Sequence, residues 1–139
     1  IENLGNSEFD LAFQFPLNVV DKRFANVDMP IGKRYARSIF LQGLLSAPTG
    51  LRANVGPGLS QFHECYHQAL AQQKISPLDY AISFVASSSC TDFFLVGVDS
   101  ILQLNQILSA DTNERSSCDD VDRLVTELDH SLIDPLTWN

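Results

Sequence analysis

The chain has 139 residues and a net charge of −8 at neutral pH, and 45% of its residues are hydrophobic against 19% charged. This balance is typical of a folded globular chain and excludes a disordered or collagen-like one, while the lack of any run of ~18 apolar residues excludes a membrane-spanning helix. The acidic surplus, with no basic stripe to offset it, argues against nucleic acid as a partner.

Three apolar runs predict buried strands. They are Phe9–Asn18 (FDLAFQFPLN), Arg37–Leu45 (RSIFLQGLL), which leads into a glycine-containing loop, and Phe93–Val98 (FFLVGV). The runs are nearly continuous and do not alternate, which is typical of parallel strands buried on both faces. Helical segments separate them, so the sequence predicts the α/β class.

Four segments between and after these strands predict helices. They are Gln61–Gln73, Ser76 to about Ala86, Asp99-Ser100 to about Leu108, and Asp119–Leu128. The clearest start is at Ser76, where a capping serine precedes a proline and an acidic residue in the first turn. Residues 110–139 form an acidic C-terminal extension, since Asp111–Asn139 holds eight acidic and two basic residues. Ser46–Ser60, rich in glycine and proline, is expected to be a long functional loop.

The cysteines bear on the compartment. Cys65, Cys90 and Cys118 make an odd number at irregular spacing. Free thiols in a reducing compartment are the simpler interpretation, so a cytoplasmic location is expected.

His63, Glu64 and His67 match the H-E-x-x-H pattern, in which two histidines one helical turn apart bind zinc. On a helical wheel the histidines fall about 100–140° from an apolar face centred near Phe62 and Tyr66, which predicts that they point sideways or outward. A catalytic zinc also needs a third protein ligand, and none is expected nearby. The pattern therefore predicts a solvated helix face and no metal site.

Five blocks in order, QFPLN, VVDKR, RSIFLQGLL, SPLDYAISFV and GVDSILQLNQIL, resemble the C-terminal half of the aldo/keto reductase family. The resemblance runs from about Phe9 to Leu108. It implies a C-terminal portion of a (β/α)8 TIM barrel, with about three parallel strands and flanking helices. Because such a barrel needs about 250 residues, residues 1–139 would be one segment of a single barrel domain.

The resemblance implies that this segment contacts a nicotinamide cofactor. Gln14, polar within an apolar run, would bind the nicotinamide carboxamide, with a hydrogen bond inside the barrel as the alternative. Arg37 stands where the family usually has a tyrosine stacked on the nicotinamide ring; its alternative is an ion pair with a carboxylate. The predicted cofactor-binding residues are Gln14, Arg37, Ser38, Gln42, Gly43, Gly97, Val98, Ser100, Gln103 and Gln106.

The strand end and helix start around Gly97 are also a phosphate candidate on physical grounds, because a helix N-terminus offers unpaired N–H groups and a positive dipole. The segment lacks a cation there and carries Asp99, so either NADP or NAD remains open.

The implied activity of the whole protein is NAD(P)H-dependent reduction of a small carbonyl substrate to an alcohol. The family's catalytic residues lie in the first half of the barrel, so this segment holds no catalytic residue and is expected to be inactive alone. Its partners would be the N-terminal half of its own barrel, or a second copy through a face that carries Phe13, Phe15, Ile39 and Leu41. The alternative is a non-catalytic half-barrel that acts as an interaction or nucleotide-binding regulatory module.

Overall fold

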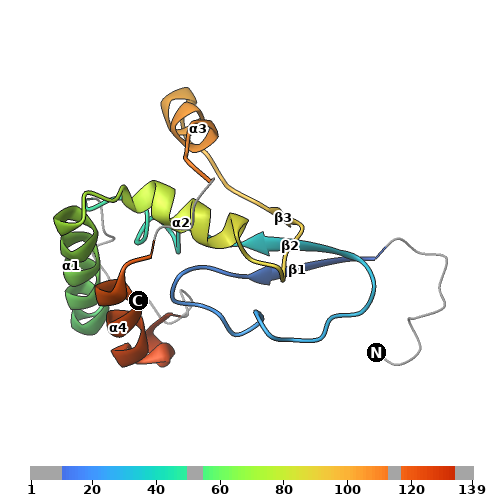
Figure 1. Ribbon diagram of the computed structural model, residues 1–139, viewed down its shortest axis with the longest axis horizontal. Coiled ribbons are helices and arrows are strands. Elements are labelled where there is room, and N and C mark those ends of the chain that lie inside the picture. The colour runs from blue at the N-terminus through green and yellow to red at the C-terminus, as the bar shows by residue number, and fades with distance from the viewer. Residues whose placement is uncertain (1–10, 50–54, 113–116, 134–139) are drawn as a thin grey trace.

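Figure 1 shows a computed structural model of the chain, which describes residues 11–49, 55–112 and 117–133. Within these ranges the elements are the strands β1 (Ala12–Pro16), β2 (Lys33–Arg37) and β3 (Phe93–Phe94), the α-helices α1 (Pro57–Gln72), α2 (Pro77–Ala86), α3 (Ile101–Leu108) and α4 (Asp119–Glu127), and a 3-10 turn η1 (His130–Ile133). No helix in the described part of the chain is long and apolar enough to cross a bilayer.

The three strands form one parallel sheet in the order β1-β2-β3. Gln14 pairs with Tyr35, and Tyr35 pairs with Phe93, so these three side chains share one face. Parallel strands separated by helices confirm the α/β class. The sheet is open: the described residues form no barrel.

The second predicted strand is misplaced. The chain is extended over Lys33–Arg37, a charged stretch that ends where the predicted strand begins, and the apolar run that follows folds into turns. Four residues in this run have positive φ angles, namely Ser38 (59°), Leu41 (44°), Gln42 (55°) and Gly43 (92°). These angles are incompatible with a strand. The run is apolar because the turns are buried: Ile39, Leu41, Leu44 and Leu45 each expose at most 2% of their surface.

The third strand is also shorter than predicted, since only Phe93 and Phe94 of the FFLVGV run are paired. The first strand follows the prediction from Ala12 onward, and the predicted start at Phe9 lies outside the described residues.

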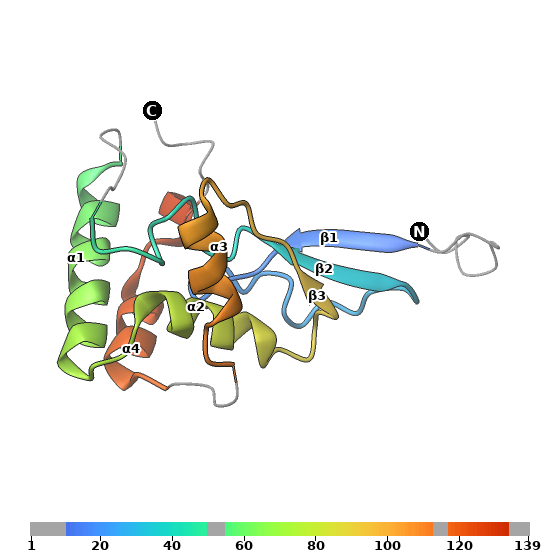
Figure 2. The same cartoon turned by 90° about the horizontal axis from the view of Figure 1, so that it is seen from above.

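Only one face of the sheet is covered. Phe15, Ala36 and Phe94 pack on Ile82 and Val85 of α2, together with Ile107 of α3. Figure 2 shows α2 and α3 next to the sheet. On the opposite face Gln14 is exposed and the Phe93 side chain is 51% exposed. The expectation of strands buried on both faces is therefore wrong within the described residues.

Helices α2 and α3 begin close to their predicted starts. The Ser76 hydroxyl accepts the N–H of Asp79 at the start of α2, and the Ser100 hydroxyl accepts the N–H of Gln103 at the start of α3. Helix α1 starts earlier than predicted, with Pro57 in its first turn, which is a favourable site for proline. The predicted loop Ser46–Ser60 therefore ends at Gly56.

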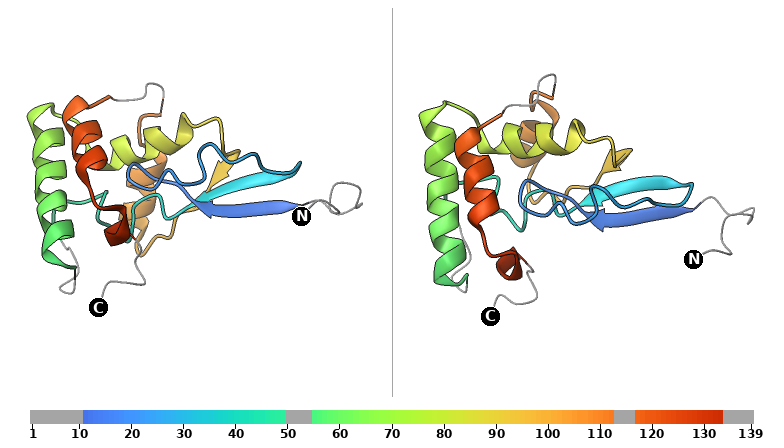
Figure 3. Two further views of the ribbon diagram at one scale, coloured as in Figure 1. Left: turned by 90° about the horizontal axis from the view of Figure 1, so that it is seen from below. Right: turned by 60° about the horizontal axis from the view of Figure 1, so that its bottom comes forward.

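Helices α1 and α4 lie side by side beyond the end of the sheet (Figure 3). Val121 and Val125 of α4 are buried against α1, and Leu124 and Leu128 pack at the margin of the same cluster. Three aspartates in the first turn of α4 place negative charge at its positive end, which favours the helix.

The orientation predicted for the two histidines of α1 is wrong. His63 and His67 are 5% and 7% exposed, because the turns after β2 cover this side of the helix. Each ring contacts a backbone carbonyl of those turns, at Ala47 and Leu44. A periodicity argument treats histidine as polar, so it misses a ring that is buried by bonding to a distant loop.

Three of the four residues predicted for self-association are not accessible to a second copy. Phe15, Ile39 and Leu41 are at most 3% exposed and already belong to the chain's own core. The surface left open on the sheet carries Gln14 and Phe93 instead.

Candidate functional site

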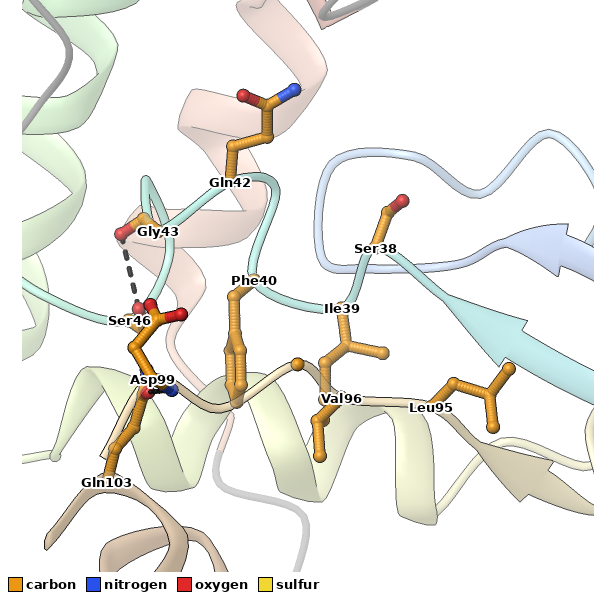
Figure 4. A pocket seen from close by; sticks show the side chains of 11 residues that line it. Ser38, Ile39, Phe40, Gln42, Gly43, Ser46, Leu95, Val96, Asp99 and Gln103 are labelled. Atoms are coloured by element: carbon orange, nitrogen blue, oxygen red, sulfur yellow. Dashed lines mark hydrogen bonds between the residues drawn. The ribbon is translucent and has the colours of Figure 1, made fainter. Parts of the chain in front are cut away.

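A cavity of about 360 Å³ lies at the carboxyl ends of β2 and β3 (Figure 4). It is lined by the turns after β2, the segment after β3 and the first turn of α3. The lining residues are Ser38, Ile39, Phe40, Gln42, Gly43, Ser46, Leu95, Val96, Gly97, Asp99 and Gln103. Ligand sites of open parallel sheets are formed at this end of the strands, so the cavity is the candidate site.

One wall of the cavity is the segment Ser38–Ser46, held by short-range hydrogen bonds. The N–H groups of Gly43 and Leu45 both donate to the carbonyl of Phe40, at 2.9 and 3.1 Å. Gly43 has a φ of 92°, which a side chain would disfavour, and the Ser46 hydroxyl donates to its carbonyl at 3.2 Å (Figure 4). The result is a compact turn whose backbone faces the cavity.

Asn18 anchors the beginning of this wall. Its side-chain oxygen accepts the N–H groups of Val20 and Asp21, which closes a turn after β1. Its amide nitrogen donates to the carbonyl of Ser38 at 3.0 Å. This fully buried side chain therefore ties the end of β1 to the end of β2.

The opposite wall is the start of α3, which is closed by two reciprocal hydrogen bonds. The Gln103 N–H donates to the Ser100 hydroxyl at 3.1 Å, and the Gln103 side-chain oxygen accepts the N–H of Asp99 at 2.8 Å. This is a variant of a capping box, shifted by one residue at its second bond. Two of the N–H groups predicted to bind phosphate are thus already occupied, which leaves those of Ile101 and Leu102 in the first turn.

Half of the predicted cofactor residues meet in the cavity: Ser38, Gln42, Gly43, Gly97 and Gln103. In Figure 4 the side chains of Ser38 and Gln42 point away from Asp99 and Gln103, so these two residues present backbone to the cavity. Gly97 has no atom within 4 Å of the position a Cβ would take. The segment after β3 is therefore open to a ligand at this point.

The other predicted residues lie around the cavity without lining it. Ser100 caps α3, and Val98 and Gln106 are exposed. Gln14 does not have the hydrogen-bond partner that its apolar surroundings predicted, because it lies on the open face of β1 in contact with solvent. Arg37 is exposed at the end of β2, and its guanidinium donates to the Ser38 hydroxyl at 3.2 Å. The ion pair considered for it does not form within the described residues.

Sequence analysis missed an aromatic pair on the open face. The rings of Tyr35 and Phe93 stack with centroids 5.1 Å apart. The register places Gln14 beside Tyr35, and Arg37 lies two residues further along the same strand and on the same face. Within Lys33–Arg37, Tyr35 and Ala36 point to opposite faces of the sheet, and this alternation is a strand signal. The three charged residues of the stretch made the strand hard to predict.

Asp99 is the single charged residue among the described residues that line the cavity. Arg34 of β2 does not line the cavity, because its guanidinium donates to Asp92 at 2.8 Å. This bond holds the pKa of the Asp92 carboxyl below its usual range. In the described part of the chain no cluster of three histidine, cysteine or acidic residues could hold a metal ion. The chemistry available at the site is thus hydrogen bonding and shape, with one negative charge.

Comparison with protein-family models, with curated proteins and with solved structures finds no match to this chain.

Proposed function

We propose that the chain is the cofactor-holding, C-terminal part of an NAD(P)H-dependent oxidoreductase of the aldo/keto reductase type. The observation that carries the proposal is the cavity at the carboxyl ends of β2 and β3, where five residues chosen as cofactor contacts from sequence come together. Its volume of about 360 Å³ falls in the range of small-ligand sites. The cavity would hold the phosphate-bearing middle of a dinucleotide between the Gly43 turn and α3.

The phosphates would meet backbone groups on both sides. Gly43 and Gly97 leave space for close approach, since neither would bring a Cβ within 4 Å of another atom. The first turn of α3 adds the N–H groups of Ile101 and Leu102 and the positive end of a helix dipole. These features favour an anion, while the Asp99 carboxylate on the same wall opposes it.

The nicotinamide would lie toward the open face of the sheet. Gln14 and Arg37 are exposed on this face, beside the stacked Tyr35 and Phe93 rings. Parallel sheets in proteins are covered on both faces, so this face would be the inner face of a barrel completed by further strands. A bound nicotinamide supplies a hydride to a carbonyl carbon; the chain's own residues orient the ring and leave the proton donor to the rest of the protein.

The described residues do not identify the acid. Tyr66 and Tyr80 are at most 4% exposed, and the Tyr35 ring, which would lie beside the nicotinamide, is stacked on Phe93. The resemblance implies that the acid lies in the first half of such a barrel, so the chain by itself is expected to show no carbonyl reduction.

Asp99 favours NADH over NADPH at this site. A 2′-phosphate near the start of α3 would meet a carboxylate and no cation among the lining residues. In the Asp99→Lys variant of the protein at its natural length we expect affinity for NADPH relative to NADH to rise about tenfold, the effect of one charge-assisted hydrogen bond.

Titration calorimetry with both cofactors tests the proposal. The exposed Asp28, on the connection between β1 and β2 and outside the cavity lining, gives a matched control in Asp28→Lys, which should leave the ratio unchanged. No detectable binding of either cofactor to the unsubstituted protein would refute the proposed function.

A second candidate function is a non-catalytic interaction module. It is favoured by the apolar surface of α3, where Ile101 is 79%, Leu102 70% and Leu108 74% exposed. Such a surface on a short helix marks a contact with another protein surface. The two candidates differ in turnover: a protein at natural length that binds NADH and reduces no carbonyl compound would favour the regulatory module.

A further inference from the structure

Three side chains on one side of α1 bind three carbonyl groups of the turns after β2. His63 Nε2 lies 3.1 Å from the carbonyl oxygen of Ala47, and His67 Nε2 lies 3.0 Å from that of Leu44. Between them, the Tyr66 hydroxyl donates to the carbonyl of Leu45 at 3.2 Å. We name His63, Tyr66 and His67 the carbonyl clamp.

The clamp fixes which ring nitrogen of each histidine faces the loop. A carbonyl oxygen can only accept, so each Nε2 carries a proton in these contacts, and in the neutral ring the lone pair is on Nδ1. For His67 this leaves Nδ1 buried and without a hydrogen-bond partner. Neither Nε2 can bind a metal while it donates to the loop, so the H-E-x-x-H spacing here serves backbone recognition.

The carbonyls need these donors because the segment forms turns without the continuous backbone ladder of a helix or strand. Leu44 and Leu45 are buried, and a buried carbonyl without a partner costs roughly 1–3 kcal/mol. The same segment carries four residues with positive φ, which neighbouring structure must hold in place.

The clamped segment is the wall of the cavity. Gln42, Gly43 and Ser46 line the cavity, and Leu44 and Leu45 between them face the opposite way, into the core beside α1. We propose that the carbonyl clamp positions the Ser38–Ala47 segment and so sets the shape of the cavity, with His63, Tyr66 and His67 acting as positioning residues. This role concerns the segment itself and is independent of which ligand the cavity takes.

If His67 positions the segment, its hydrogen bond to the Leu44 carbonyl matters and not only the volume of its ring. In His67→Leu the ring's volume is largely kept and the donor is lost, whereas in His67→Gln an amide N–H replaces Nε2–H at a similar reach. The positioning role predicts that only the leucine variant loosens the segment. Gln68→Leu, at the exposed neighbouring position on α1, is the matched control.

Amide hydrogen exchange of the chain without ligand is the test. In His67→Leu we expect the N–H groups of Gly43, Leu44, Leu45 and Ser46, which bond within the segment, to exchange about tenfold faster, while those of β2 and α2 keep their rates. His67→Gln and Gln68→Leu should keep the rates of the unsubstituted chain. Unchanged rates in His67→Leu, or equal acceleration everywhere, would overturn the proposal.

A second variant keeps the test decisive if His67→Leu fails to fold. Tyr66→Phe removes one hydroxyl and keeps the ring in the core, so it should accelerate exchange in the same segment alone. Exchange in Tyr66→Phe that is accelerated to the same degree throughout the chain, or not accelerated in this segment, would also overturn the proposal. The exchange is measured without any cofactor, so its outcome does not depend on whether the protein binds a dinucleotide.

Discussion

The two ends of the molecule bury their apolar residues to very different degrees. At the helical end, α1, α4, η1 and the turns after β2 enclose one cluster, in which Tyr66, Leu45, Leu70 and Val121 are fully buried. At the sheet end, α2 covers one face, while α3 and the other face of the sheet leave Ile101, Leu102 and Phe93 more than half exposed. Among the described residues, the helical end is enclosed, whereas one face of the sheet and the outer side of α3 are uncovered.

The cavity lies between these two ends. One wall, the Ser38–Ser46 segment, is bonded to the helical end through the carbonyl clamp. The other wall, at Gly97–Gln103, is the segment that leads into α3 and the first turn of that helix. Helix α3 contributes only Ile107 to the buried core. A ligand between the walls would therefore order the sheet end more than the helical end.

Truncation of a core residue should separate the two ends most clearly. In Tyr66→Ala we expect the free energy of unfolding to fall by about 3–5 kcal/mol, because a fully buried aromatic side chain is lost. Ile101→Ala, on the exposed side of α3, should change it by less than about 0.5 kcal/mol. Urea denaturation measures both, and similar losses would contradict the contrast.

The next effect comes from glycines at the sheet end. A Cβ at Gly32 would lie 2.7 Å from the carbonyl oxygen of Leu11 and 2.8 Å from the Phe13 ring, so Gly32→Ala should cost about 1–3 kcal/mol by overpacking the entry to β2. Gly97→Ala, which meets no atom within 4 Å, is the control and should be nearly neutral. If thermal unfolding finds Gly32→Ala as stable as the control, the close approach of β1 and β2 is wrong.

Two helix caps give a smaller comparison. Ser76→Ala and Ser100→Ala each remove a hydroxyl that accepts a first-turn N–H, worth about 1 kcal/mol. Helix α2 packs into both clusters, so Ser76→Ala should lower global stability, whereas Ser100→Ala should fray α3 and leave the rest protected. Hydrogen exchange along both helices distinguishes the two, and global loss in Ser100→Ala would show that α3 is integral to the fold.

We expect the smallest effect from pH. Burial lowers the pKa of His67 below its ordinary 6.5, the bond to Leu44 opposes this, and His63 lowers the pKa further. The unfolded chain then binds the proton first as the pH falls, so stability is full above pH ~6.5 and declines below it. Denaturation at pH 7.5 and 5.5 should show this decline, and His67→Gln should reduce it; an equal decline in the variant would assign it to other groups.

Local chemistry made the helix starts predictable. The cap at Ser76 with Asp79 is predicted from spacing alone and is present, and the helix predicted from Asp99-Ser100 begins with Ser100 as its cap. Asn18 likewise forms its turn with neighbours two and three residues away. Such features depend on short stretches of chain, which a sequence displays directly.

Long-range contacts made the rest unpredictable. Burial of the RSIFLQGLL run comes from α1 and α4, so an apolar run that folds as turns looked like a strand. His67 is buried by a carbonyl 23 residues away, which no periodicity reveals. Of the predicted cofactor residues, Gly43, Gly97 and Gln103 line the cavity, whereas Gln14 was expected inside a core that the described residues do not form around it.

Amide NMR of the protein at its natural length, titrated with NADH, tests the central claim most directly. The account predicts saturable shifts in two segments, Ser38–Ser46 and Gly97–Gln103, which line the cavity from opposite sides. Helix α4, at the helical end, should show none. Absence of shifts with both NADH and NADPH, or shifts confined to residues outside these two segments, would contradict the claim that the cavity holds a nicotinamide dinucleotide.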